Sequence, residues 1–132
     1  MEDWKKQLSG IRDLICKKET RPAWLCDYHS QHAVPIERAY YYRFLYEVTR
    51  ALKPQFTVEI GTNTAVSTAS LAAGHPSGQI LTIDPNPDVI RYVNAIRDKG
   101  IVNVSLISEP SLKAHVQLAK YPKINLNRLI TA

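Results

Sequence analysis

The stretch that most constrains how this chain can fold is residues 56–84, where two short apolar runs flank a helical segment. The runs at 56–60 (FTVEI) and 79–83 (QILTI) are rich in β-branched side chains, which predicts strands. Between them, a turn of small residues at 61–65 (GTNTA) leads into a helix predicted over 64–73. A strand, a crossover helix and a second strand make a parallel βαβ unit. We therefore expect an α/β fold whose parallel sheet carries helices on both faces.

The turn and the end of the second strand carry residues that suit a nucleoside ligand. Gly61 allows the backbone to approach a ligand closely, and the free N–H groups that open the following helix favour an anionic group. Asp84, directly after the second strand, is placed where an acid accepts hydrogen bonds from ribose hydroxyls. The sequence therefore predicts that Gly61 and Asp84 face one crevice. An ordinary βα turn without a ligand is the alternative.

The glycine pattern separates two classes of cofactor. A dinucleotide fingerprint needs three glycines spaced G-x-G-x-x-G, and this turn has only Gly61, which argues against NAD or FAD. Residues 59–72 read E-I-G-T-N-T-A-V-S-T-A-S-L-A. They resemble the first motif of class I S-adenosylmethionine-dependent methyltransferases, in particular the small-molecule O-methyltransferase branch, with E-I-G-T-x-x-G-x-S-T-x-x-L-A. Ala65 stands where that family usually has glycine; a positive φ there would cost about 1 kcal/mol, and the Cβ would crowd the methionine end of the cofactor.

Two later segments strengthen this resemblance. Ile83-Asp84-Pro85-Asn86-Pro87 matches the family's acid with a nearby Asn-Pro. After the third strand, the relatives read approximately G-x-S along the adenine, and here Ser111 matches the serine while Glu109 replaces the glycine. The resemblance implies S-adenosylmethionine as the cofactor, held by the following residues: Glu59, Gly61, Thr62, Asn63, Thr64, Ala65, Ser67, Asp84, Pro85, Asn86, Glu109 and Ser111. A helix N-cap is a second role for Ser111.

The chain is expected to form one domain, residues 1–132, in which a helical N-terminal cap (1–54) precedes a cofactor-binding βαβαβ core (55–126). Apolar residues at helical spacing predict two helices in the cap, the second starting near Pro35. The resemblance implies a Rossmann-like sheet that is truncated after about the fourth strand, which we expect to begin at 123–126.

Helix boundaries after the second strand follow from capping residues. We expect Asn86 as an N-cap, Pro87 as the first helical residue and Asp88 as an acidic complement to the helix dipole. Gly100 is expected to end this helix in a left-handed conformation. A third strand is predicted over 102–107, followed by a third core helix.

Tyr40, Tyr41, Tyr42 and Tyr46 cluster on the second N-terminal helix. They suggest an aromatic pocket. At this spacing, however, we favour packing, with some of the four rings in the core and others half-exposed.

Between the two N-terminal helices, Cys26-x-x-His29-x-x-His32 offers three metal ligands within a short segment. Structural zinc sites use four ligands in paired spacings, and no second pair follows. We therefore interpret the segment as a polar loop with no metal, and keep zinc as the alternative. Cys16 and Cys26 are expected to be free thiols.

The acceptor side of the enzyme is not visible in the sequence. In complete relatives the fourth strand ends in an acidic residue, often followed by a histidine, and acceptor-binding residues come from that strand onwards. No acid follows Glu109 in this chain, so the resemblance covers the cofactor half and names no catalytic residue. If the fourth strand fails to pair, the strand at Val58 is an open edge, which predicts self-association.

Composition excludes several other classes. The net charge of +5 is spread along the chain, which argues against nucleic acid, and no apolar run approaches the length of a membrane span. The first residues do not form a signal peptide, so a cytoplasmic location is expected.

The function that these observations favour is methyl transfer from S-adenosylmethionine to a small-molecule acceptor at oxygen, with this chain carrying the cofactor-binding half. The alternative is a non-catalytic nucleotide-binding or interaction module derived from the same fold. A nicotinamide-dependent oxidoreductase comes third because the turn lacks two of the required glycines.

Overall fold

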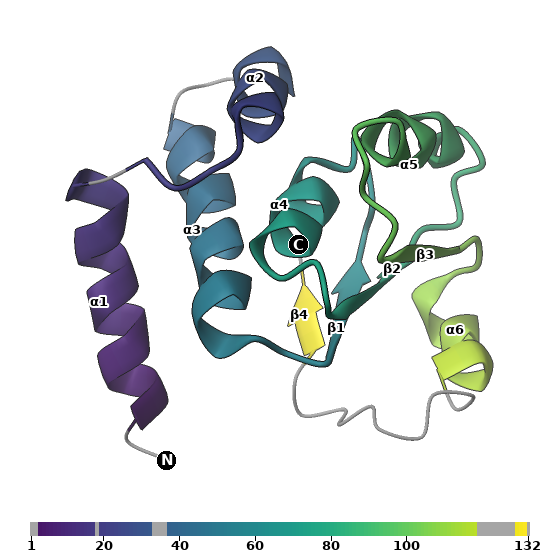
Figure 1. Ribbon diagram of the computed structural model, residues 1–132. Helices are drawn as coiled ribbons and strands as arrows, with labels where there is room; N and C mark the ends of the chain where they lie inside the picture. Colours follow the sequence, from purple (N-terminus) through teal and green to yellow (C-terminus); the bar gives the residue numbers. More distant parts are fainter. Residues whose placement is uncertain (1–2, 18, 33–36, 119–128, 132) are drawn as a thin grey trace.

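The computed structural model describes residues 3–17, 19–32, 37–118 and 129–131 (Figure 1). Three helices precede a sheet whose strands alternate with further helices. In chain order the elements are α1 (Asp3–Lys17), α2 (Ala23–His32), α3 (Glu37–Leu52), β1 (Phe56–Ile60), α4 (Val66–Gly74), β2 (Gln79–Ile83), α5 (Val89–Arg97), β3 (Val104–Ile107), α6 (Ser111–Leu118) and β4 (Leu129–Thr131).

The sheet has the strand order β3-β2-β1-β4, and all neighbouring strands run parallel. β1 and β2 begin and end at the predicted residues, in a register that pairs Phe56 with Gln79 and Ile60 with Ile83. Because the strands are parallel, their carboxyl ends meet at one edge of the sheet. In α/β sheets that edge is where ligands bind.

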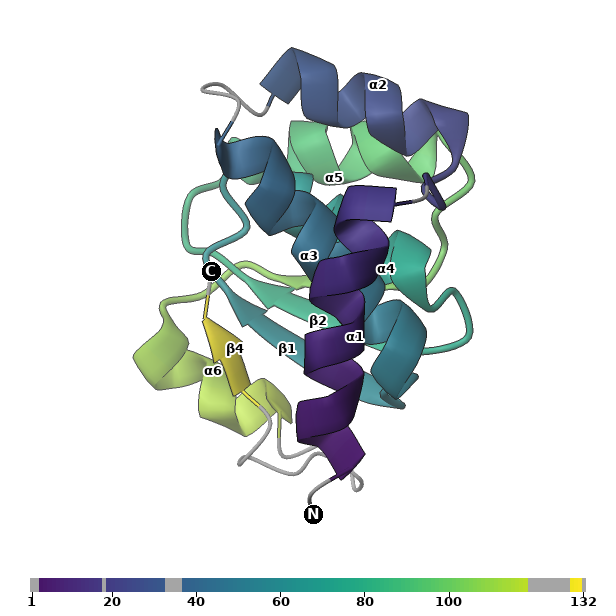
Figure 2. The ribbon, with the colours of Figure 1, turned by 90° about the vertical axis from the view of Figure 1, so that its left-hand side faces the viewer.

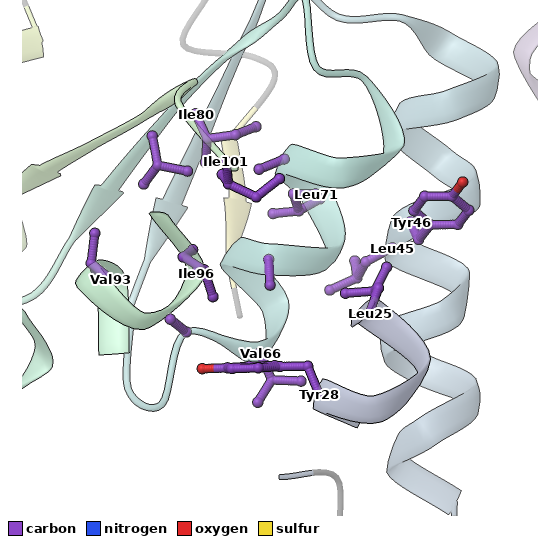
Figure 3. Packing of buried hydrophobic residues seen from close by; sticks show 14 residues of the cluster. Leu25, Tyr28, Leu45, Tyr46, Val66, Leu71, Ile80, Val93, Ile96 and Ile101 are labelled. Atoms are coloured by element: carbon purple, nitrogen blue, oxygen red, sulfur yellow. The ribbon is translucent and has the colours of Figure 1, made fainter. Parts of the chain in front are cut away.

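Helices cover both faces of the sheet, as predicted (Figure 2). On one face Val58, Leu81 and Ile107 pack with Ala114 of α6. On the other face Ile80 joins a larger apolar cluster that draws side chains from α2, α3, α4 and α5 (Figure 3). The alternation of side chains along each strand divides these two clusters between the faces.

The prediction of two N-terminal helices was wrong, because the segment read as a polar loop is a helix, α2. The carbonyl of Pro22 accepts hydrogen bonds from the N–H groups of Leu25 (3.0 Å) and Cys26 (3.2 Å), which forms the first turn. Leu25, Tyr28 and His29 are buried on one side of this helix. Their i, i+3, i+4 spacing is the helical one, but the polar residues between them hid it.

The fourth strand lies beside β1, as the resemblance implied, but further along the chain. The predicted residues 123–126 fall outside the described residues, and β4 (Leu129–Thr131) pairs with Val58, Glu59 and Ile60 of β1. β1 is therefore an interior strand, so the open edge expected at Val58 is not formed there. Pro35, where the second helix was expected to start, also lies outside the described residues.

Several boundaries differ by a few residues. β3 begins at Val104 because Val102 is 88% exposed and contributes nothing to the core. α5 begins at Val89 rather than at Pro87, and Asn86 instead accepts a hydrogen bond from the N–H of Asp88 (3.0 Å) ahead of the helix. Gly100 takes the predicted left-handed conformation (φ 94°).

The opening of α6 also differs from the N-cap expected at Ser111. The carbonyl of Pro110 accepts hydrogen bonds from the N–H groups of Lys113 (2.8 Å) and Ala114 (3.1 Å), so Ser111 is already inside the helix.

Candidate functional site

The turn between β1 and α4 contains three residues with positive φ, a backbone conformation that residues other than glycine rarely adopt. Gly61 has φ 91°, Asn63 has φ 49° and Ala65 has φ 60°. A hydrogen bond from the N–H of Gly61 to the carbonyl of Ile83 (2.8 Å) holds the turn against β2, and one from the N–H of Ala65 to the carbonyl of Thr62 (2.8 Å) closes the turn on itself. Ala65 therefore does have the positive φ that its sequence position suggested. A residue with a Cβ in this conformation costs about 1 kcal/mol of stability.

Asp84 joins the two strand ends that were predicted to face one crevice. Its Oδ2 accepts a hydrogen bond from the N–H of Asn63 (3.0 Å), and its Oδ1 accepts one from the N–H of Asn86 (2.9 Å). Gly61 and Asp84 thus lie at the same edge of the sheet. A carboxylate has about four acceptor positions, so each oxygen of Asp84 retains capacity for a ligand hydroxyl.

A cavity of about 280 Å³ lies against this turn. Its lining combines two tyrosines of α3 with the turn and the start of α4: Tyr41, Tyr42, Gly61, Thr62, Asn63, Thr64, Val66 and Ser67. The lining residues thus include hydroxyl side chains and two aromatic residues. Because α4 begins at Val66, the first N–H groups of the helix lie at the cavity, where they favour an anionic group.

The tyrosines of α3 divide between the core, the cavity and the surface, where Tyr40 is 60% exposed and outside the cavity lining. Tyr46 is buried and donates its hydroxyl hydrogen to the carbonyl of Thr20 (2.9 Å). Tyr41 is 44% exposed and Tyr42 is half-buried, and both line the cavity. Packing therefore accounts for Tyr46, whereas Tyr41 and Tyr42 also contribute to the site.

Glu59 lies beneath the turn, fully buried, and is not among the residues that line the cavity. Its Oε1 accepts hydrogen bonds from the hydroxyls of Thr68 and Thr82, while its Oε2 has no hydrogen-bond partner among the described residues. Thr82 is in turn 2.6 Å from the hydroxyl of Thr62, which belongs to the turn. Glu59 therefore reaches the site through a chain of hydroxyls.

Burial raises the pKa of Glu59 to about 7, and the charge of Asp84 adds to this, while the hydrogen bonds from Thr68 and Thr82 act in the opposite direction. A carboxyl group with this pKa takes up or releases a proton near neutral pH. The turn therefore lies over a buried carboxyl group whose pKa is shifted towards neutral pH.

The predicted residues at the ends of β2 and β3 lie at the same edge of the sheet but are not among the residues that line the cavity. Pro85 and Asn86 are exposed beside Asp84. Glu109 is half-buried and Ser111 is exposed, both beyond the end of β3 and outside the cavity lining. The N–H of Asp84 donates to the carbonyl of Ile107 (3.1 Å), which brings the ends of β2 and β3 together.

The zinc alternative places its ligands on α2, where His29 has other partners. Its Nε2 lies 2.7 Å from the hydroxyl of Ser70, and its Nδ1 lies 2.8 Å from Nη1 of Arg21. Arg21 can only donate, so Nδ1 accepts and the proton sits on Nε2. Burial and then Arg21 lower the pKa of His29 to about 4. Within the described part of the chain, no three His, Cys, Asp or Glu side chains are grouped to hold a metal ion.

Sequence reasoning missed one contact at the site. The hydroxyl of Tyr28, on α2, donates a hydrogen bond to the carbonyl of Thr64 (2.8 Å) and so ties α2 to the turn. The signal that could have revealed it is the helical spacing of Leu25, Tyr28 and His29 after Pro22.

Among the helices that the structure describes, none combines the length and the apolar composition that a membrane crossing requires.

Comparison with known proteins places this arrangement in a known fold. No protein-family model matches the sequence, and neither does any curated protein. The structure is similar to that of the SAH-bound methyltransferase PaMTH1 of Podospora anserina, with a TM-score of 0.64 and 17% identity over 88% of this chain and 53% of that one. It is also similar to a methyltransferase of Geobacter sulfurreducens, with a TM-score of 0.56 and 22% identity over 79% of this chain and 58% of that one. The chain has a methyltransferase-like fold and spans little more than half the length of these two proteins.

Proposed function

We propose that this chain is the cofactor-binding half of an S-adenosylmethionine-dependent methyltransferase that methylates a small-molecule acceptor at oxygen. The observation that carries the proposal is the joint between Asp84 and the β1–α4 turn, beside a cavity at the start of α4. One acid and one strained turn at the same sheet edge is the arrangement that binds an adenosyl group by its ribose and its amino-acid end.

The residues present fit such a group. Asp84 has acceptor capacity left for two ribose hydroxyls. The cavity offers backbone N–H groups and hydroxyls for a carboxylate, and Tyr41 and Tyr42 offer ring faces for a cationic centre. Glu59 keeps one buried carboxylate oxygen without a partner among the described residues, which would complement an ammonium group above the turn.

The chemistry asks for little beyond binding and orientation. The sulfonium of the bound cofactor supplies the methyl group. The residues of this chain hold the adenosyl group, and an acceptor has to be held in line with the methyl group by residues outside the set named above.

The alternative, a nucleotide-binding or interaction module without catalysis, is favoured by Ala65. Ala65 is fully buried and has positive φ, at the position where the resembling family usually has glycine and therefore no Cβ. Incubation with labelled S-adenosylmethionine and a panel of catechols and sugars separates the two: methyl transfer supports the enzyme, and binding without transfer supports the module.

Isothermal titration with S-adenosylmethionine, S-adenosylhomocysteine and NAD tests the cofactor class. We expect heat with both adenosyl compounds and none with NAD. Asp84→Asn should weaken the adenosyl compounds by roughly tenfold or more, because hydrogen bonds to a charged acceptor are the stronger ones. Asp88→Asn is the matched control, since Asp88 is exposed and its side chain caps nothing. Absence of heat with either adenosyl compound contradicts the proposal.

Self-association remains part of this proposal, with a different edge from the one first expected. β3 and β4 are the outer strands of the sheet, and among the described residues no strand pairs with their outer edges. Such edges can add a strand from a second copy. Light scattering at tens of micromolar should show a species larger than a monomer; a monomer counts against self-association.

A further inference from the structure

The β1–α4 turn holds a conformation that needs support from its surroundings. Asn63 and Ala65 both carry a Cβ and both have positive φ, and Thr64 lies between them. Backbone of this kind persists only where neighbouring groups fix it. The question is which groups hold it when a ligand occupies the crevice.

Three hydrogen bonds hold the turn, two of them to the end of β2 and one within the turn itself. Gly61 donates to Ile83, Ala65 donates to Thr62, and Asn63 donates to the carboxylate of Asp84. The last of these shares its acceptor, the carboxylate of Asp84, with the ribose under the proposed function. The peptide between Thr64 and Ala65 is held by one of these bonds at its N–H, whereas its carbonyl takes part in none of the three.

The carbonyl of that peptide is held by a residue of α2. The hydroxyl of Tyr28 donates to the carbonyl of Thr64 over 2.8 Å, directly before the left-handed Ala65. Tyr28 is itself fixed: its side chain is 5% exposed, and its ring centroid is 4.3 Å from that of His32. Burial, and then the neighbouring Tyr92, raise the pKa of Tyr28 to about 12, so its hydroxyl stays a donor over the working pH range.

We propose that Tyr28 is a positioning residue, which holds the Thr64–Ala65 peptide in the orientation that the adenosyl ligand requires and so couples α2 to ligand binding. This inference rests on the proposed function for the identity of the ligand. The coupling between α2 and the ligand acts equally in both directions. If α2 favours ligand binding, the bound ligand therefore stabilises α2 against opening.

The test compares two Tyr→Phe variants that remove the same chemical group. Tyr28→Phe removes the hydrogen bond to Thr64, and Tyr46→Phe removes an equivalent bond, to the carbonyl of Thr20 (2.9 Å), away from the turn. With S-adenosylhomocysteine as the probe, Tyr28→Phe should raise the dissociation constant roughly fivefold, the usual effect of one hydrogen bond, whereas Tyr46→Phe should leave it unchanged. Both variants should lower the melting temperature by similar amounts.

Hydrogen exchange adds a measurement that a purely structural role would not change. In the wild type and in Tyr46→Phe, S-adenosylhomocysteine should slow the exchange of α2 amides, and in Tyr28→Phe this slowing should be lost. Without any ligand, the amide of Ala65, which donates to Thr62, should exchange faster in Tyr28→Phe than in the other two proteins.

Each outcome decides a different point. Equal affinity of Tyr28→Phe and the wild type overturns the role of Tyr28 and leaves the proposed function standing. Equal weakening by both variants also overturns it, because the effect is then one of general stability. If the wild type does not bind S-adenosylhomocysteine, the proposed function and the ligand coupling fail together, and the exchange of Ala65 still shows whether Tyr28 holds the turn.

Discussion

The two edges of the sheet are built in opposite ways. At the carboxyl edge, Asn63 and Ala65 hold left-handed backbone, and Glu59 keeps a buried carboxylate oxygen that no described residue pairs. At the amino edge, the side-chain nitrogen of Asn103, just before β3, donates to the carbonyls of Ala72 (3.3 Å), His75 (3.3 Å) and Gly78 (2.7 Å).

The difference shows where this fold gives up stability. Left-handed backbone and a carboxylate oxygen without a partner among the described residues lie at the edge that has the cavity. The shared hydrogen bonds of Asn103 and the close packing around Gly74 lie at the other. Binding sites need groups that are left unsatisfied until a ligand arrives, so local stability and binding compete at the carboxyl edge. Four substitutions test this contrast.

The largest effect is expected at the amino edge, from Gly74→Ala. A Cβ at this position would lie 2.1 Å from Oγ1 of Thr49 and 2.2 Å from the carbonyl oxygen of Tyr46, so α3 and α4 would have to move apart. We expect a loss of more than about 3 kcal/mol in the free energy of unfolding, measured by urea denaturation.

Gly10→Ala is the matched control for Gly74→Ala. A Cβ on Gly10, in α1, meets nothing within 4 Å. There the same substitution should stabilise the protein by about 0.5 kcal/mol or more, through helix propensity alone. If both substitutions have the same small effect, the packing of α3 on α4 is looser than described.

The second-largest effect is expected at the carboxyl edge, where the protonation of Glu59 makes stability depend on pH. The folded pKa of Glu59, about 7, exceeds its ordinary value of 4.5, so the folded state binds the extra proton and stability falls as pH rises between these two values. Glu59→Gln removes this loss, and relative to the wild type it should gain about 2 to 3 kcal/mol in the free energy of unfolding between pH 5 and pH 8.

Only the difference between Glu59→Gln and the wild type isolates Glu59, because His29 acts in the opposite direction. The folded pKa of His29, about 4, lies below its ordinary value of 6.5, so its contribution to stability is lost as pH falls through that range. Denaturant titrations of both proteins across pH 4–9 measure the effect. A wild-type-minus-variant difference that does not change with pH contradicts the raised pKa of Glu59.

The third effect is expected at the amino edge, from removing the hydrogen bonds of the Asn103 side chain. Asn103→Ala leaves the carbonyls of Ala72, His75 and Gly78 without their shared donor and should cost about 2 kcal/mol in the free energy of unfolding. Asn94→Ala, on the exposed side of α5, serves as the control and should change stability by less than about 0.5 kcal/mol. Equal effects at both positions would remove the contrast between the two edges.

The smallest effect relieves the strain at the carboxyl edge. Ala65→Gly should stabilise the protein by about 0.5 to 1 kcal/mol, because glycine adopts positive φ freely. Ala69→Gly, inside α4 and equally buried, should destabilise it by about 1 kcal/mol or more. Thermal melts of the two variants should shift in opposite directions; a shift in the same direction would mean that Ala65 is not strained.

The strands of the βαβ unit were predicted more accurately than the N-terminal helices. β1 and β2 were predicted to the residue, because each is a short β-branched run bounded by turn residues on both sides. The left-handed Gly100 followed from the helix pattern before it. α2 was missed, because its burial depends on partners far along the chain, such as Ser70 for His29 and Thr64 for Tyr28.

The structure brings some of the predicted site residues together, through contacts that the sequence did not indicate. Gly61, Thr62, Asn63, Thr64 and Ser67 do line the cavity, and Asp84 does join them at the same edge. The sequence could not place Glu59 beneath the turn rather than in the cavity, nor bring Tyr41, Tyr42 and Tyr28 to it from the N-terminal cap. Those contacts depend on how α2 and α3 pack on α4.

By itself, the sequence determined the parallel βαβ unit, its strand ends and the residues that occupy the crevice edge, because these follow from local periodicity and turn chemistry. Only the tertiary structure decided which groups hold the turn, which carboxylate stays buried beneath it, and where the fourth strand pairs. Those features depend on contacts between segments far apart in the chain, and local patterns do not encode the energy of such contacts.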